Sequence, residues 1–369
     1  MDMRDLEEYK VLGEPGKAEK SENWQAAIGL QQVDGLKPSE YLIKTAIANI
    51  EGDITFDEVN SRLNAYYQEN SVGTFDDERT EEADKVSARI AEILSEKAFH
   101  FSPAEFIGIH GRLFAGVFTH AGTVRTVNIT KDEWVLENET VLYAGANMIM
   151  AALKHDFENE KSFNYLGLNK QKTMEHISKF VSDIWQIHPF REGNTRTTAV
   201  FIIKYLRKLG FKVDNEQFAK HSWYFRNALV RANYTDLGKG VGASARFLHS
   251  FFENLLLGET NELKNRYIHI RWNGKNGTIN EENAPVNDGN APVNGKNAPV
   301  NAPVKFTKTQ AKILEMLRED NTLTREFLCA RLQKDIGTIK RAIKALREKG
   351  VLERKGSDKT GYWEVKNHP

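Results

Sequence analysis

The chain has 369 residues, of which 40% are hydrophobic and 28% are charged. This length gives a prior of two or three domains, and this composition excludes collagen-like, mucin-like and wholly disordered chains. No uncharged apolar run approaches the length of about 18 residues that a membrane-spanning helix needs. The charged first residues lead us to expect no secretory signal. A single cysteine, Cys329, excludes a disulfide framework and is typical of a cytoplasmic protein.

The formal net charge of zero hides an uneven distribution. Residues 305–366 contain 16 lysines and arginines against nine aspartates and glutamates, so this end carries +7 and the remainder carries −7. A basic end on an otherwise acidic chain is typical of a nucleic-acid-binding module.

Most of the chain before residue 273 has a helical pattern. Apolar residues at three- and four-residue spacing predict helices at 81–94, 173–187, 197–209, 223–232 and 243–257. A further small helical region is expected from about Ser21 to Tyr67. Residues 123–142 differ, because their β-branched and aromatic side chains predict a short β-hairpin. The fold class is therefore mainly α, with a small β-hairpin flap.

A different composition marks residues 273–304. This segment repeats Ala-Pro-Val-Asn three times and holds four of the nine prolines. With so few large apolar residues, it cannot bury enough surface to offset its ordering entropy. We expect a disordered, flexible tether there.

The segment most informative about chemistry reads IHPFREGNTR and spans residues 187–196. His188 ends the apolar stripe of the preceding helix, and Pro189 stops that helix, so the chain turns here. A new helix is expected to begin near Thr195, with Asn194 or Thr195 as its cap.

A helix that starts just after a glycine presents unpaired backbone N–H groups, which suit a phosphate. Gly193 permits close approach of the backbone, and Asn194 and Arg196 add donors. Glu192 is an oxygen ligand able to hold a Mg²⁺ ion that bridges phosphates. His188 is placed to take a proton from an incoming hydroxyl. Each residue alone is more often structural, but their combination within nine positions favours a catalytic phosphate site.

Residues 188–196 resemble the signature of the Fic family, His-x-Phe-x-Asp/Glu-Gly-Asn-Gly-Arg-x-x-Arg. The resemblance extends to LFAGVFTHAGTVR at 113–125, to NIT at 128–130 and to FRNALVRAN at 225–233. It covers roughly residues 81–257 and implies a Fic-type helical domain with a flap.

The resemblance implies transfer of a nucleoside monophosphate, usually AMP from ATP, to a Ser, Thr or Tyr hydroxyl of a protein, the chain itself included. It assigns His188 as the general base, Phe190 as a structural anchor and Glu192 as the Mg²⁺ ligand. The phosphate-binding residues that it implies are Gly193, Asn194, Thr195 and Arg196. The flap residues that it implies for target binding are Asn128, Ile129 and Thr130.

Two positions depart from the signature. Thr195 replaces its third small residue, and Ala199 replaces its second arginine. The resemblance assigns that arginine to the γ-phosphate and to the inhibitory glutamate of the family. Ala199 therefore leaves the donor open, and uridylylation and phosphocholination remain alternatives.

Residues 24–67 resemble the small helical antitoxins that partner some Fic toxins. Two acids are candidates for the inhibitory residue, Asp34 before Gly35 and Glu51 before Gly52. Neither has the serine or threonine that the family pattern places four positions earlier. We predict that residues 21–67 pack on the catalytic domain with only weak inhibition, and a helical brace without a regulatory role is the alternative.

Residues 307–365 resemble a winged helix-turn-helix domain. Its predicted parts are a first helix at 323–332, a turn at 335–338, a second helix at 338–350 and a wing at 351–363. On the second helix, Lys340, Arg341 and Lys344 are candidates for contacts with DNA phosphates. Binding to a protein is the alternative.

These patterns predict four parts: a helical segment at 1–70, a catalytic domain at 81–272, a linker at 273–304 and a winged helix at 305–369. The leading hypothesis is a cytoplasmic protein adenylyltransferase that uses ATP and Mg²⁺ and does not bind membranes. The alternative is a DNA-binding transcriptional regulator whose Fic domain senses a nucleotide without turnover. The oligomeric state stays open, a homodimer included.

Overall fold

The computed structural model describes residues 6, 8–9, 12–70, 74–213, 215–272, 307–319, 321, 323, 325–332, 334, 336–348, 351–355 and 362–365. The predicted tether at 273–304 and the predicted start of the turn at Asp335 lie outside these residues. The chain divides into two compact units, Met1–Asn290 and Ala291–Pro369, and each is described by itself.

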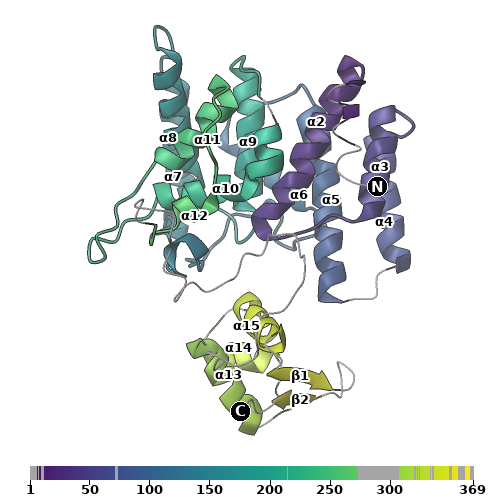
Figure 1. Ribbon diagram of the computed structural model, residues 1–369, viewed down its shortest axis with the longest axis vertical. Coiled ribbons are helices and arrows are strands. Elements are labelled where there is room, and N and C mark those ends of the chain that lie inside the picture. The colour runs from purple at the N-terminus through teal and green to yellow at the C-terminus, as the bar shows by residue number, and fades with distance from the viewer. Residues whose placement is uncertain are drawn as a thin grey trace. The chain divides into compact units, whose positions relative to one another are not determined.

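The first unit is built from helices (Figure 1). They are α2 (Pro15–Gly29), α3 (Glu40–Glu51), α4 (Phe56–Asn70), α5 (Phe75–Ser95), α6 (Pro103–Phe114), α7 (Ile149–Ser162), α8 (Lys170–Ile187), α9 (Asn194–Lys208), α10 (Glu216–Ala232), α11 (Arg246–Leu257) and α12 (Asn265–Ile268). Short 3₁₀ helices are η1 (Leu30–Asp34), η2 (Trp134–Leu136) and η3 (Ala146–Met148). The helices predicted from apolar spacing overlap α5, α8, α9, α10 and α11.

Side-chain caps fix several helix starts. The hydroxyl of Ser39 accepts a hydrogen bond from the backbone N–H of Leu42 at the start of α3. Asn169 caps α8 in the same way, and Thr74 forms a capping box at the start of α5. These caps satisfy amide groups that have no partner within the helix.

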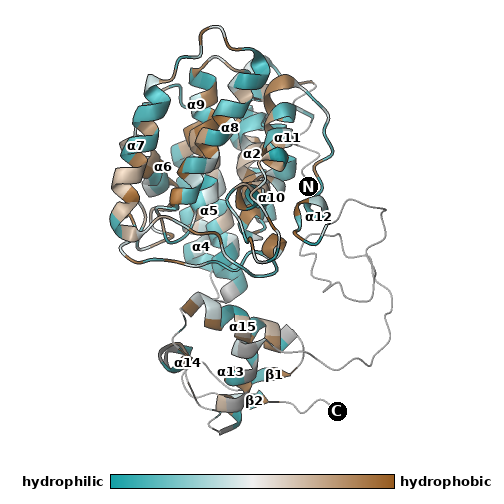
Figure 2. Ribbon diagram, turned by 90° about the vertical axis from the view of Figure 1, so that its left-hand side faces the viewer, coloured by the Kyte–Doolittle hydropathy of each residue, from teal (hydrophilic) through white to brown (hydrophobic). Residues whose placement is uncertain are grey.

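The N-terminal segment belongs to the same core as the helices around the motif. Helix α2 packs against α5 and α10 (Figure 1), and Trp24, Ala27 and Leu30 are fully buried. Hydrophobic and hydrophilic stretches both occur along the helices of this unit (Figure 2). Removing residues 1–70 would therefore expose core surface, so point substitutions are the better test of this segment.

The contact between α2 and α10 leaves no room for a side chain at Gly29, since an added Cβ atom would lie 2.2 Å from the carbonyl oxygen of Ala219. We expect Gly29→Ala to lower the free energy of unfolding by about 1–3 kcal/mol or more. Gly16, at the open start of α2, has no atom within 4 Å of an added Cβ, so Gly16→Ala is the matched control. Urea titration measures both, and equal stabilities of the two variants would contradict this packing.

The flap, defined here as residues 128–142, has little regular structure. Glu133 and Glu139 form an isolated antiparallel bridge, and η2 lies between them. The expected hairpin is therefore reduced to this bridge, because Val135 and Leu136 turn into the core and are fully buried.

The second unit is a small helical domain with a two-stranded sheet. Its elements are α13 (Lys308–Glu319), α14 (Arg325–Leu332), α15 (Ile336–Glu348), β1 (Leu352–Lys355) and β2 (Tyr362–Val365). The strands are antiparallel and pair Leu352 with Val365. Ile339, Ile343 and Leu346 of α15 are buried in its own hydrophobic core. Helix α15 begins two residues earlier than predicted.

Across the described part of the chain, no helix combines the length and the apolar character that a membrane crossing requires.

Candidate functional site

The motif turn joins α8 to α9. Helix α8 ends at Ile187, and its C-cap His188 has left-handed backbone angles of φ 51° and ψ 60°. The N-cap of α9 is Gly193, with φ 77°, and not Asn194 or Thr195 as the sequence suggested. A Cβ atom on Gly193 would lie 2.4 Å from the ring of Phe114. Both the backbone angle and this contact require glycine.

The side chains of Asn194 and Thr195 hold the turn together. Asn194 accepts a hydrogen bond from the Phe190 amide at 2.9 Å and donates one to the Phe190 carbonyl at 2.8 Å. The hydroxyl of Thr195 accepts from the indole N–H of Trp185. These partners explain why neither side chain caps α9.

The start of α9 keeps its anion-binding character. Among the described residues, none accepts a hydrogen bond from the backbone amides of residues 193–196. These amides and the helix dipole favour a negatively charged group above the turn.

His188 lies in the form that a general base requires. Its Nδ1 atom is 3.3 Å from the carbonyl oxygen of Trp185, which can only accept, so Nδ1 carries the proton and Nε2 the lone pair. Burial lowers the pKa of His188 well below its usual range, and the nearby charge of Lys131 lowers it further. The ring is 3% exposed, and the ring of Tyr143 covers it at 4.1 Å between centroids.

Arg125, which sequence reasoning did not single out, fixes the backbone of this turn. Its guanidinium is buried and donates to the carbonyls of His188 at 2.7 Å, Val127 at 2.8 Å and Ala144 at 2.6 Å. One side chain thus connects the residues that flank the flap on either side to the histidine. Its presence within the stretch that resembles the Fic family was the only signal available.

Phe190 is fully buried and stacks on His110, with 3.7 Å between ring centroids. His110 accepts a hydrogen bond from the Gly122 amide through Nδ1 and lies 3.1 Å from the Glu192 carbonyl through Nε2. Because Nδ1 accepts, Nε2 carries the proton. His110 is therefore a neutral ring that stabilises the motif turn through its contacts with Phe190 and with the Glu192 carbonyl.

Burial lowers the pKa of His110 from 6.5 to about 4. The unfolded chain takes up this proton below about pH 6.5 and the folded chain only near pH 4, so the stabilisation is complete above 6.5 and is lost between these values. As the pH falls from about 6.5 to about 4, we expect the titration of His110 alone to lower the free energy of unfolding by about 3 kcal/mol. Urea titrations at several pH values give the free energy of unfolding as a function of pH. This free energy should fall less steeply with decreasing pH in His110→Gln than in the parent chain, and an equal fall would contradict this assignment.

Arg196 is fully enclosed by groups of the chain. Its guanidinium lies 2.9 Å from a carboxylate oxygen of Asp34 and 2.6 Å from one of Glu82, and donates to Gln31 at 3.0 Å. The ring of Phe114 packs against it. Asp34 and Gln31 both come from η1, so the N-terminal segment reaches the motif directly.

Asp34 lies among several positive charges. Arg79 donates to the backbone carbonyls of Asp34 and Gly35 and so fixes this turn. Loss of surrounding water alone would raise the pKa of Asp34, but Arg196, then Lys131 and other cations, together lower it. The carboxylate stays charged and is 35% exposed.

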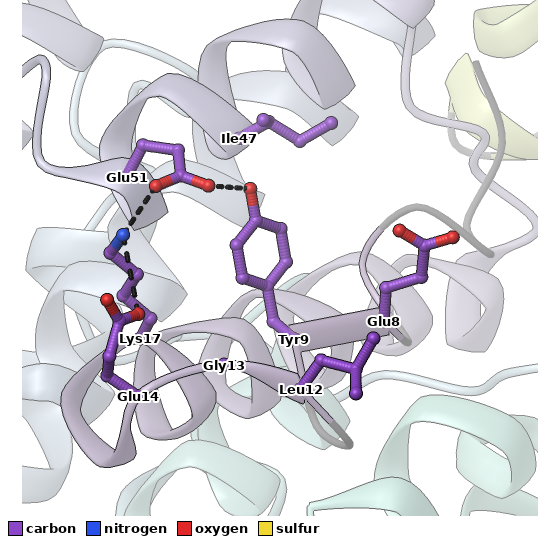
Figure 3. Close-up of a pocket in the computed structure, with 8 residues that line it drawn as sticks. All are labelled: Glu8, Tyr9, Leu12, Gly13, Glu14, Lys17, Ile47 and Glu51. Atoms are coloured by element: carbon purple, nitrogen blue, oxygen red, sulfur yellow. Dashed lines mark hydrogen bonds and ion pairs between the residues drawn. The ribbon is translucent and has the colours of Figure 1, made fainter.

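Glu51, the other inhibitory candidate, lies elsewhere. It lines a hollow of about 460 Å³ between the first residues of the chain and α3 (Figure 3). There its carboxylate accepts hydrogen bonds from Tyr9 and from Lys17, the latter at 2.6 Å. The structure therefore brings Asp34, and not Glu51, to the motif.

Glu192 is exposed beside the turn and forms an ion pair with Lys131 of the flap at 2.9 Å. Within the described ranges, no three His, Cys, Asp or Glu side chains gather in a way that could hold a metal ion. A single exposed carboxylate still fits Mg²⁺ at a nucleotide site, since this ion is commonly bound by one or two carboxylates together with phosphates and water.

Sequence comparison assigns this region. The profile of the Fic/DOC family matches residues 100–206, which contain the whole turn from His188 to Arg196. This chain contains a Fic/DOC domain. The profile of the winged helix-turn-helix DNA-binding family matches residues 306–353.

Curated relatives align with the Fic/DOC domain and its surroundings. Protein adenylyltransferase VbhT of Bartonella schoenbuchensis is 28% identical over 140 residues, which are 35% of this chain and 28% of that protein. Probable protein adenylyltransferase y4lH of Sinorhizobium fredii is 28% identical over 137 residues, covering 36% and 66%. Probable protein adenylyltransferase Fic of Escherichia coli is 28% identical over 116 residues, covering 31% and 54%. The chain thus spans less than two thirds of each relative.

Solved structures include the N-terminal Fic domain of a Bartonella effector protein from Bartonella sp. AR 15-3. It is 21% identical with a TM-score of 0.41, and the match covers 50% of this chain and 84% of that one. The Fic domain of Bep8 from Bartonella sp. 1-1C is 20% identical with a TM-score of 0.40, covering 50% and 88%.

The flap of the Fic/DOC domain carries the three residues predicted to bind a target. Asn128 and Thr130 are exposed and Ile129 is half-buried. The side chain of Asn128 also accepts a hydrogen bond from the Ala146 amide at 2.9 Å. Asn128 is therefore partly engaged in holding the flap.

In the winged helix, the DNA-contact candidates lie on α15 away from its buried residues. Arg341 and Lys344 are exposed, and Lys340 is half-buried. Arg341 contacts Gly337 and Thr338 of its own helix at 3.3 Å. Much of the wing predicted at 351–363 lies outside the described residues.

Proposed function

We propose that this chain is a protein nucleotidyltransferase that moves AMP from ATP to a Ser, Thr or Tyr hydroxyl of a protein, its own chain included. The observation that carries the proposal is the fixed neutral form of His188 beside the free amides at the start of α9. The names of the three curated relatives support AMP as the transferred group. We place the activity in the cytoplasm, where the lone thiol of Cys329 stays reduced.

The proposed base is His188. A neutral imidazole with its lone pair on Nε2 accepts the proton of the target hydroxyl, and its low pKa keeps it neutral at physiological pH. The carbonyl of Trp185 fixes the tautomer, and Arg125 fixes the backbone that orients the ring.

The proposed phosphate site is the turn at 192–196. Its main-chain amides bind phosphate oxygens, and Arg196 receives the outer phosphate. Glu192 would hold a Mg²⁺ ion that neutralises phosphate charge when bound. The protein contributes position and electrostatics, which are the main requirements of phosphoryl transfer.

We propose that Asp34 inhibits this site. Its carboxylate is negatively charged, as a phosphate is, and already pairs with Arg196. Glu82 pairs with the same guanidinium, so Arg196 keeps one acidic partner when Asp34 leaves. Because α2 is part of the core, release requires movement of the turn at 34–35 and not dissociation of the whole segment.

The test is transfer of label to protein in Mg²⁺ buffer from ATP labelled at the α-phosphate or, separately, at the γ-phosphate. The proposal requires label from the α-phosphate only. Label from the γ-phosphate would indicate a kinase, and label from another nucleotide or from CDP-choline would change the donor. Buried Ala199 leaves that choice open.

A second candidate is a DNA-binding regulator whose Fic/DOC domain senses a nucleotide without turnover, and the winged helix-turn-helix match favours it. It requires that nucleotide change the affinity for DNA and that His188→Ala leave this change intact. DNA affinity should also fall with salt concentration and with loss of Lys340, Arg341 or Lys344.

A further inference from the structure

Lys131 connects the flap to the motif turn. Its Nζ atom lies 2.9 Å from Oε2 of Glu192. Its backbone N–H donates to the hydroxyl of Thr140 at 3.0 Å, which holds the lysine between the two sides of the flap. The Lys131 side chain is 24% exposed, so it is largely enclosed while Glu192, at 57%, is open.

The charge of Lys131 also reaches the other groups of the site. It contributes to the low pKa of both His188 and Asp34. Two ion pairs within the chain thus compensate the charges of the site: Asp34 pairs with Arg196, and Lys131 pairs with Glu192. A bound donor has to replace Asp34 at Arg196 and Glu192 at Lys131.

We propose that Lys131 is an additional catalytic residue of the transfer, whose ammonium leaves Glu192 and contacts an oxygen of the transferred phosphate. This inference rests on the proposed function. In that reaction, the target hydroxyl oxygen forms a bond to the α-phosphorus, and its proton passes to Nε2 of His188. The bond between the α-phosphorus and the bridging oxygen breaks, and pyrophosphate leaves with the electron pair. Negative charge on the α-phosphoryl oxygens is what the ammonium stabilises.

A consequence separates this role from a simple fastening of the flap. The ammonium of Lys131 and a divalent cation repel each other and compete for the carboxylate of Glu192. Loss of Lys131 should therefore weaken phosphate binding and strengthen metal binding. If Lys131 only held the flap in place, its loss would leave both phosphate binding and metal binding unchanged, or would weaken both by loosening the flap.

The test uses the full chain carrying Asp34→Ala, so that Arg196 is free of that partner. Calorimetry measures the Kd for inorganic triphosphate without metal, and electron paramagnetic resonance measures the Kd for Mn²⁺ without phosphate. We expect Lys131→Met to weaken triphosphate binding about tenfold and to tighten Mn²⁺ binding. Lys239→Met is the matched control, because Lys239 pairs with Glu139 of the flap at 2.8 Å, and it should change neither.

The assignment of Lys131 is overturned if both affinities stay unchanged or both weaken in Lys131→Met, or if the parent chain binds neither probe. Opposite shifts of the two affinities support it. If those shifts occur but no labelled nucleotide reaches any protein, the proposed transfer fails while the placement of Lys131 at a phosphate site stands.

Discussion

Replacing Asp34 with alanine is expected to raise nucleotide transfer by about tenfold or more, since each 1.4 kcal/mol of lost competition gives a factor of ten. The Asp34 carboxylate lies 2.9 Å from the Arg196 guanidinium, where the outer phosphate of a donor would bind. The Asp34 carboxylate and the donor phosphate are both anions, so the donor must displace the Asp34 side chain from Arg196. Without Asp34, Arg196 keeps Glu82 and Gln31 as partners and stays in position.

The measurement is the initial rate of α-label transfer at subsaturating ATP for the parent chain and the variant. Asp34→Asn removes only the charge and should give most of the increase. Glu51→Ala is the matched control, because Glu51 pairs with Lys17 and Tyr9 away from the motif, and it should leave the rate unchanged. An Asp34→Ala rate equal to that of the parent would mean that the N-terminal segment is only a brace.

Replacing His188 with alanine should lower transfer by about a hundredfold to ten-thousandfold, the usual contribution of a general base. Donor affinity should change little, because the proposed phosphate ligands are the amides of 193–196 and Arg196, and His188 is not among them. Parallel rate and equilibrium-binding measurements on His188→Ala separate the two effects. Undiminished transfer in this variant would remove the histidine from the chemistry.

The low pKa of His188 also predicts the pH profile. An ordinary histidine is half protonated near pH 6.5, whereas buried His188 stays neutral below that value. The rate of transfer in Asp34→Ala should therefore stay flat as the pH falls through about 6.5.

The bend between α8 and α9 could be predicted from the sequence because its determinants are local. Pro189 ends one helix, Gly193 supports a positive φ angle, and the residues between them follow in order along the chain. Even there the cap was misjudged. Asn194 bonds to Phe190 across the turn, a partner that propensity at a single position does not reveal.

The groups around the turn could not be predicted in the same way, because packing brings them from distant segments. Arg125 and His110 are buried polar side chains and Glu82 is a partly buried one, and helical periodicity treats such positions as exceptions. Choosing Asp34 over Glu51 likewise required knowing that η1, and not the end of α3, packs against α9. The flap was overestimated as a hairpin because the β-branched Val135 was counted as a strand residue, whereas it lies in the 3₁₀ helix η2 and is buried in the core.

The most direct test of the whole account is mass spectrometry of the Asp34→Ala chain, alone and with cell lysate, after incubation with Mg²⁺ and each nucleoside triphosphate in turn. The account predicts that a protein Ser, Thr or Tyr gains one nucleoside monophosphate, most readily AMP, and that Asp34→Ala combined with His188→Ala gives none. The absence of any adduct with every nucleotide, or an adduct that forms equally well without His188, would contradict it.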